Sequence, residues 1–177
     1  KTREGGVMRL ENLIADIDEE MFRKIVENRS VRDKDARDTA KIVGLAAIKY
    51  GDLSNQATKD YIFDVDRFTS FEGNTGPYIL YTIVRIKSIL SRYVQEGGKL
   101  DAGEILPASN GSEKNLMLQL TGFGSMIESA FEEKAPHKIC AYIYEVSNAF
   151  NSFYHETKIL SEENQAQKES YIRVLQL

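Results

Sequence analysis

The chain has 177 residues, of which 42% are hydrophobic and 28% charged, and its net charge is −4. This balance is ordinary for a globular domain with its own core. No apolar run reaches the ~18 residues that a membrane-spanning helix needs, and no apolar signal region follows the N-terminus, so we expect no membrane partner. A single cysteine, Cys140, excludes an internal disulfide and fits the reducing cytoplasm.

The negative net charge argues against a protein that coats nucleic acid by bulk electrostatics. The charge is unevenly distributed along the chain. Residues 1–100 hold 17 Lys and Arg against 16 Asp and Glu, whereas residues 101–177 hold 6 against 11. Any contact with RNA is therefore expected to use local basic patches, mainly in the first hundred residues.

In the first part of the chain, apolar residues repeat at helical spacing. The spacing predicts helices over about 10–29 and 34–50, and a short helix over 64–71. Gly51 marks the end of the second helix, and the polar stretch from Leu53 to Thr58 predicts a loop. The apolar residues that mark the first helix are Leu10, Ile14, Ile17, Met21 and Ile25.

Residues 72–77, EGNTGP, predict an interruption of helical structure followed by the start of a new helix. Asn74 or Thr75 can cap the helix, and Pro77 is tolerated in its first turn. That helix covers about 76–96, and a loop follows over 99–112. A further helix is expected over 113–134, with Ser112 as its cap and a local weak point at Gly122. Two more helices are expected over 136–155 and over 164–177, and the last of them reaches the end of the sequence.

The helix over 113–134 should carry Leu116, Phe123 and Ile127 on one face. The helix over 136–155 should turn Phe150 and Phe153 inward. Helix follows helix without an alternating strand pattern. The sequence therefore predicts an all-α bundle.

No cluster of residues predicts catalysis or metal binding. His137 and His155 are isolated, Cys140 has no CxxC partner, and no phosphate-binding loop is present. No nucleophile and base pair stands out either. We expect neither a catalytic residue nor a metal ligand.

The helix after Gly76 carries an unusual polar stripe. In helical projection its polar and aromatic residues share an arc of about 80°: Tyr78, Tyr81, Arg85, Ser88 and Arg92. Aromatic rings stack on unpaired bases, and arginine pairs with phosphates. The alternative is a set of tyrosines packed in the core with hydroxyls reaching the arginines. The loop Leu53–Thr58 is a second candidate, since Ser and Asn can bond base edges, although an ordinary connector is equally compatible.

Several segments, taken together and in order, resemble the C-terminal part of arginyl-tRNA synthetases. They are GLAAIKYGDLSN at 44–55, YIFD at 61–64, FEGNTGPYILY at 71–81 with Arg85 and Ser88 after it, HKICAYIYE at 137–145 and FNSFY at 150–154. The first ten residues, KTREGGVMRL, resemble the segment at and just after the mobile signature loop of class I synthetases. That loop helps to hold ATP phosphates, so Lys1 and Arg3 would be its remnant.

The resemblance implies a helical bundle of the anticodon-binding type that arginyl and cysteinyl enzymes share. Residues 1–72 would form a helical stem at the end of the catalytic region, and residues 73–177 a C-terminally truncated anticodon-binding domain. The residues that it implies for tRNA contact are Ser54, Asn55, Phe71, Tyr78, Tyr81, Arg85 and, on the facing helix, Tyr154.

The implied parent enzyme is a cytoplasmic ligase that attaches arginine to its tRNA with ATP and magnesium. This chain would supply tRNA recognition, need no cofactor and be inactive alone, because the nucleotide-binding fold is expected upstream. Its partners would be arginine-specific tRNA and the missing N-terminal catalytic domain. The alternatives are the anticodon-binding domain of a related synthetase, such as the cysteinyl one, and a helical protein-interaction bundle without an RNA partner.

Overall fold

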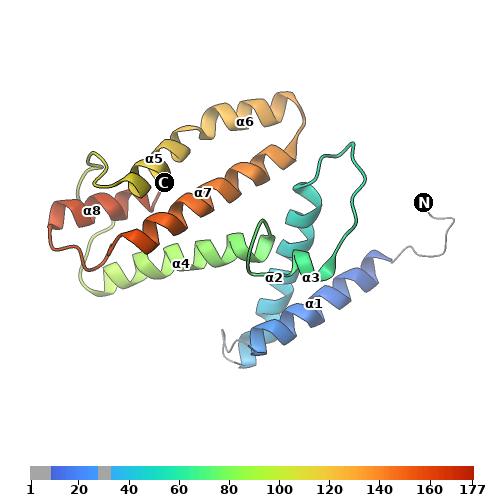
Figure 1. Cartoon of the computed structure of the whole chain (residues 1–177). Helices are drawn as coiled ribbons and strands as arrows, with labels where there is room; N and C mark the ends of the chain where they lie inside the picture. The colour runs from blue at the N-terminus through green and yellow to red at the C-terminus, as the bar shows by residue number, and fades with distance from the viewer. Residues whose placement is uncertain (1–8, 28–32) are drawn as a thin grey trace. The chain divides into compact units, whose positions relative to one another are not determined.

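A computed structural model of the chain describes residues 9–27 and 33–177 (Figure 1). All regular structure in these residues is helical, which confirms the predicted all-α class. The helices are α1 (Leu10–Glu27), α2 (Asp33–Leu53), α3 (Val65–Phe68), α4 (Gly76–Gln95), α5 (Gly111–Thr121), α6 (Phe123–Glu132), α7 (Pro136–Glu156) and α8 (Gln165–Val174). In this part of the chain, no helix is both long enough and apolar enough to cross a membrane.

The chain divides into two compact units, and the boundary falls inside α4, between Leu80 and Tyr81. The first unit is built on the packing of α1 against α2. Large apolar side chains of α1 meet small ones of α2 in its core: Ile17, Met21, Ile25, Ala36, Ala40, Val43 and Ala47 are all buried. Small residues on one helix allow the larger side chains of the other to interdigitate closely.

The start of α4 lies against the backbone of α2 at Gly76. A Cβ atom at this glycine would lie 2.3 Å from the carbonyl oxygen of Ala46, so no larger residue fits without movement of a helix. Thr75 caps α4 as predicted: its Oγ1 accepts from the Tyr78 backbone N–H at 3.2 Å and donates to the Ser70 carbonyl at 2.6 Å. A closely packed glycine and a cap therefore fix where α4 begins.

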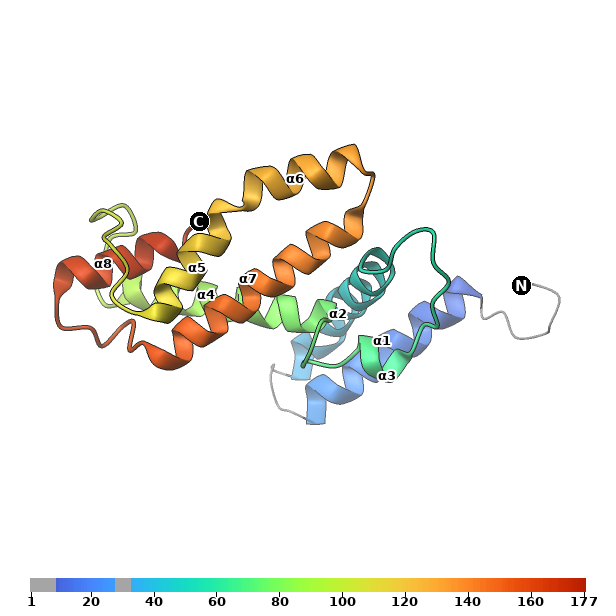
Figure 2. The same cartoon turned by 45° about the horizontal axis from the view of Figure 1, so that its top comes forward.

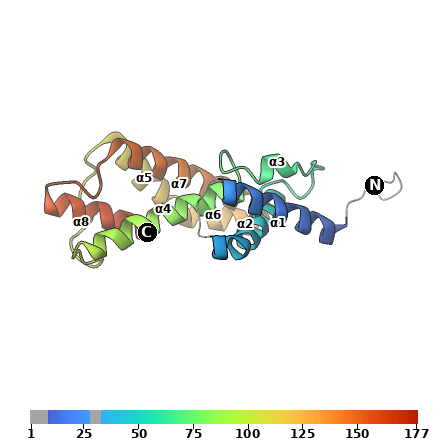
Figure 3. The same cartoon turned by 90° about the horizontal axis from the view of Figure 1, so that it is seen from below.

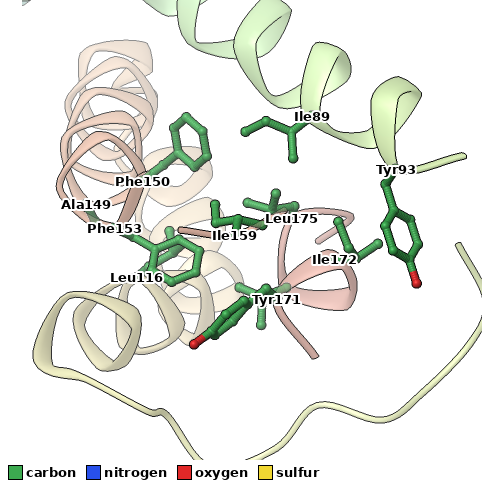
Figure 4. Packing of buried hydrophobic residues seen from close by; sticks show 11 residues of the cluster. Ile89, Tyr93, Leu116, Ala149, Phe150, Phe153, Ile159, Tyr171, Ile172 and Leu175 are labelled. Atoms are coloured by element: carbon green, nitrogen blue, oxygen red, sulfur yellow. The ribbon is translucent and has the colours of Figure 1, made fainter. Parts of the chain in front are cut away.

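The second unit contains the rest of α4 and helices α5 to α8. Figures 1 and 3 show the C-terminal half of α7 alongside α4, with α8 at the same end of the bundle. In Figure 4, side chains from α4, α5, α7 and α8 point into one interior. The buried residues of this core are Ile89, Tyr93, Leu116, Ala149, Phe150, Phe153, Ile159, Tyr171, Ile172, Val174 and Leu175. The predicted inward positions of Phe150 and Phe153 are thus confirmed, and Leu116 of the predicted apolar face is buried with them.

The single helix predicted over 113–134 is wrong, because the chain forms two helices that meet at Gly122 (Figure 2). Its predicted cap, Ser112, is also wrong. Asn110 has extended backbone angles, and its Oδ1 accepts from the Glu113 backbone N–H at 2.9 Å. Asn110 is therefore the cap, and α5 begins at the next residue, Gly111. The Ser112 hydroxyl instead donates to Asn110 at 2.8 Å.

Three further predictions are corrected at helix ends and faces. Helix α2 continues through Gly51 to Leu53, and a Cβ atom at Gly51 would lie 2.8 Å from the Phe68 ring, so the glycine serves close packing there and does not end the helix. Helix α8 ends at Val174, before the last residues of the sequence. Four residues of the predicted apolar faces are exposed: Leu10, Ile14, Phe123 and Ile127. Periodicity identifies the apolar face of a helix, but a neighbour must lie there to bury it.

Candidate nucleic-acid interface

The centre of the candidate site is Arg85 of α4, whose guanidinium lies between two tyrosine rings. Its Cζ is 4.7 Å from the ring centroid of Tyr81 and 4.9 Å from that of Tyr154 on α7. Both distances are within cation–π range. Tyr81 is 50% exposed and Tyr154 39% exposed, so the stripe is open to solvent at this point rather than sealed in the core.

A hydrogen-bonded pair orients the guanidinium between the rings. Arg85 Nη1 donates to Asn151 Oδ1 at 2.5 Å, and Asn151 Nδ2 donates to Thr82 Oγ1 at 3.4 Å. Thr82 is buried, so the chain from Thr82 through Asn151 anchors Arg85 to the interior of the second unit. A guanidinium has five N–H donors, so the bond to Asn151 leaves others for an external acceptor.

The Tyr154 ring rests on the core. It stacks on Phe150, four residues earlier on the same face of α7, with centroids 6.0 Å apart and planes at 30°. Phe150 is fully buried and so supports the Tyr154 ring from the core, while Tyr154 itself remains 39% exposed. A ring held in this way offers a flat platform at little cost in side-chain entropy.

A cleft of about 410 Å³ adjoins Tyr154 between α4 and the end of α7. We call it the α4–α7 cleft; its lining is Ser88, Ile89, Arg92, Tyr154, His155, Thr157, Lys158, Ile159, Leu160 and Ser161. This lining includes Arg92 and Lys158 and no carboxylate. Arg92 donates to Glu96 at 2.9 Å, which partly offsets its charge, while Lys158 is exposed. The cleft therefore favours an anionic ligand.

Together these features suit unpaired nucleotides. Single-stranded bases stack on aromatic rings, while arginine and lysine contact the phosphates between them. Duplex readout would instead need a long basic surface, which the charge balance of the second unit does not provide.

The predicted tRNA-contact residues fall into two groups. Tyr81, Arg85 and Tyr154 lie together in the second unit. Tyr78 lies in the first unit and is half-buried. Phe71 packs against the first core.

The two loop residues, Ser54 and Asn55, bond to their own helix. Ser54 Oγ and Asn55 Nδ2 both donate to the Gly51 carbonyl, at 3.1 and 2.6 Å, and so satisfy the C-terminal end of α2. The predicted ATP-loop remnant, Lys1 and Arg3, lies outside the described residues. Within those residues, no group of three His, Cys, Asp or Glu side chains could hold a metal ion.

Sequence reasoning gave no role to three residues at the site: Asn151, His155 and Lys158. On α7, Tyr154 and His155 follow Asn151 by three and four residues. A helical projection therefore places Asn151, Tyr154 and His155 near one face of the helix. The pairing of Asn151 with Arg85, 66 positions away in the sequence, has no local signal.

The fold and this surface define a class: an all-α domain that exposes an arginine between two tyrosine rings beside a cleft with basic side chains. Residues 79–177 match the family model described as the DALR anticodon binding domain. Residues 1–65 match the catalytic domain of class I tRNA synthetases (R). The chain belongs to the DALR anticodon-binding domain family, which confirms the predicted family type.

Curated relatives and solved structures match this chain over nearly all of its length. The chain is 65% identical over 185 residues to the arginine–tRNA ligase of Agathobacter rectalis, with 100% of this chain and 31% of that protein covered. It is 52% identical to the ligase of Alkaliphilus oremlandii, with 100% and 30% covered. Among solved structures, it is similar to the arginyl-tRNA synthetases of Thermus thermophilus (TM-score 0.85, 23% identity, 97% and 29% covered) and Plasmodium falciparum (0.81, 25%, 96% and 30%). The chain thus spans about 30% of the length of these relatives.

Proposed function

We propose that this chain binds the anticodon loop of arginine-accepting tRNA, as part of a ligase that joins arginine to that tRNA. One observation carries the proposal: the Arg85 guanidinium is held between two half-exposed tyrosine rings and anchored by Asn151. Such a group is already oriented before RNA arrives, so less side-chain entropy is lost on binding.

Each side chain has a distinct role in the proposal. The rings of Tyr81 and Tyr154 stack on bases that have left the anticodon stack. Arg85 donates its remaining N–H groups to a phosphate or a base edge. In the α4–α7 cleft, Arg92 and Lys158 attract the phosphates of the neighbouring nucleotides.

The other predicted contact residues have a supporting role here. Ser54 and Asn55 complete the end of α2, and Phe71 completes the first core. Direct RNA contact by these three residues, or by Tyr78, stays a prediction. The same holds for the division into a stem of residues 1–72 and an anticodon-binding domain of residues 73–177.

The activity of the whole ligase is likewise a proposal. It would use ATP and magnesium in the cytoplasm, with the chemistry supplied by catalytic regions that the relatives have beyond the span of this chain. The role that we propose for the described residues is to bind and orient the tRNA, without a cofactor of their own.

The test compares two variants of the complete ligase that each remove one positive charge from α4. Arg85→Ala removes the held guanidinium, whereas Lys87→Ala removes an exposed charge two residues away, about 200° around the helix. We expect Arg85→Ala to weaken binding of an arginine tRNA transcript by about 1–2 kcal/mol, the size of a charge-assisted contact, and Lys87→Ala to have a much smaller effect.

Binding is measured by fluorescence anisotropy, with circular dichroism to verify folding. Equal losses of tRNA affinity for the two variants would mean that Arg85 contributes to binding only through its positive charge and makes no specific contact. An unchanged affinity of folded Arg85→Ala would remove the proposed contact.

A further inference from the structure

Helix α6 exposes an apolar stripe that the second unit does not cover. Phe123, Ile127 and Phe131 follow one another at four-residue intervals and therefore share a face. They are 57%, 37% and 83% exposed. We call these three residues the α6 stripe. Figure 2 shows α6 and α7 joined at the end of the second unit away from α8.

An apolar groove of about 590 Å³ continues the stripe toward α7. Its apolar lining consists of Ile127, Ala130, Phe131, Ala135, Pro136 and Ile139. The charged residues nearby are mostly acidic: Glu128, Glu132 and Glu133 against Lys134, with Glu133 also paired to Lys138. The charged side chains in the lining are one acid and one base, Glu132 and Lys134, so the groove has no net positive charge to attract a phosphate backbone. The occupant is therefore a protein surface.

The size of the stripe decides between a second copy and a tethered partner. With roughly 200 Å² for each full side chain, the exposed parts amount to about 350 Å². A stable interface between separate molecules buries about 800 Å² on each partner. The stripe alone is thus too small to hold a second copy. A surface on the same polypeptide needs much less area, because tethering raises its effective concentration to the millimolar range.

The relatives supply such a surface. This chain covers only 31% of the Agathobacter rectalis ligase, and its match to the catalytic-domain family is confined to residues 1–65. We infer that the α6 stripe docks against the remaining catalytic part of the same ligase chain. The inference rests on the proposed function only in taking the chain to be part of such a ligase.

The experiment is hydroxyl-radical footprinting of the complete ligase without tRNA, read by mass spectrometry. Each modification rate is divided by the rate of the same residue in the denatured ligase. In this chain Phe131 is more exposed than Tyr81. If the stripe is docked, Phe131 is modified several-fold more slowly than Tyr81. If Phe131 reacts as fast as Tyr81 or faster, the stripe faces solvent and the inference is overturned.

Dilution and a pair of variants complete the test. Protection of Phe131 that disappears on dilution would assign the stripe to a second copy and overturn the inference. Phe131→Ser should lower the thermal unfolding midpoint of the complete ligase, while Leu118→Ser, at a 59% exposed residue of α5 outside the stripe, should leave it nearly unchanged. Equal midpoints for the two variants would also overturn it. Because no tRNA is present, these results are independent of the Arg85 test.

Discussion

Replacing Asn151 by alanine removes the acceptor that holds Arg85 between its two tyrosines. Asn151 connects the Arg85 guanidinium to the buried hydroxyl of Thr82, and therefore couples an exposed cation to the core. In the proposed site, Asn151 acts through Arg85 and does not contact RNA itself. Its removal should weaken tRNA binding only as far as it lets Arg85 move.

The expected size follows from the contacts that remain. A hydrogen bond to a charged group contributes about 1.5–3 kcal/mol when desolvated, but Arg85 is half-exposed and water replaces part of the lost bond. The two tyrosine rings still hold the guanidinium, with about 0.5–1 kcal/mol each. We therefore expect Asn151→Ala to weaken tRNA binding by about 0.5–1 kcal/mol, less than Arg85→Ala.

A double-mutant cycle tests this dependence. Since Asn151 acts through Arg85, the double variant should bind tRNA no more weakly than Arg85→Ala alone. Ser152→Ala, at the exposed neighbouring position of α7, is the control for the helix itself. Additive losses in the double variant would show that Asn151 contacts the RNA directly, and would refute the positioning role.

Three further predictions concern stability and pH. Gly76→Ala should cost about 3 kcal/mol or more, since its Cβ would lie 2.3 Å from the Ala46 oxygen; an unchanged urea midpoint would contradict the close packing. Phe153→Ala, at a fully buried site, should lower the free energy of unfolding by about 3–5 kcal/mol in the same assay. Burial and a hydrogen bond to Asp52 raise the pKa of Tyr61 to about 12, so its contribution to stability is present below pH of about 10 and lost as pH rises through 12. In a titration followed by phenolate absorbance, the signal that is present in the unaltered chain and absent in Tyr61→Phe should therefore appear near pH 12. If that signal appeared near the ordinary tyrosine pKa of about 10, the environment described here for Tyr61 would be wrong.

Local signals in the sequence were enough to predict the helical class and most helix positions. The i, i+4 spacing of Ile17, Met21 and Ile25 predicts the buried face of α1, and the structure confirms it. Thr75 and Pro77 mark the start of α4 because capping and a fixed φ are properties of the residues themselves. The same stretch also supports the family resemblance that the comparisons confirm.

Errors arose where a choice depended on distant parts of the chain. Ser112 is the predicted cap of α5, but Asn110 caps it instead, and Asn110 is also held by a bond from its Nδ2 to Thr157 Oγ1 at 3.0 Å, 47 positions away in the sequence. Gly51 is a typical helix-ending residue, but in the structure it lies inside α2, where the lack of a side chain lets the Phe68 ring approach closely. Local preference is weak compared with such tertiary contacts.

By itself, the sequence determined that α4 carries tyrosines and arginines on one stripe, because helical geometry alone sets that spacing. Only the tertiary structure decided that Tyr154 and Asn151 of α7 complete the site around Arg85, and that the second unit leaves the apolar face of α6 exposed. Spacing along a helix is a local property, whereas burial and pairing depend on which surface the rest of the chain brings alongside it.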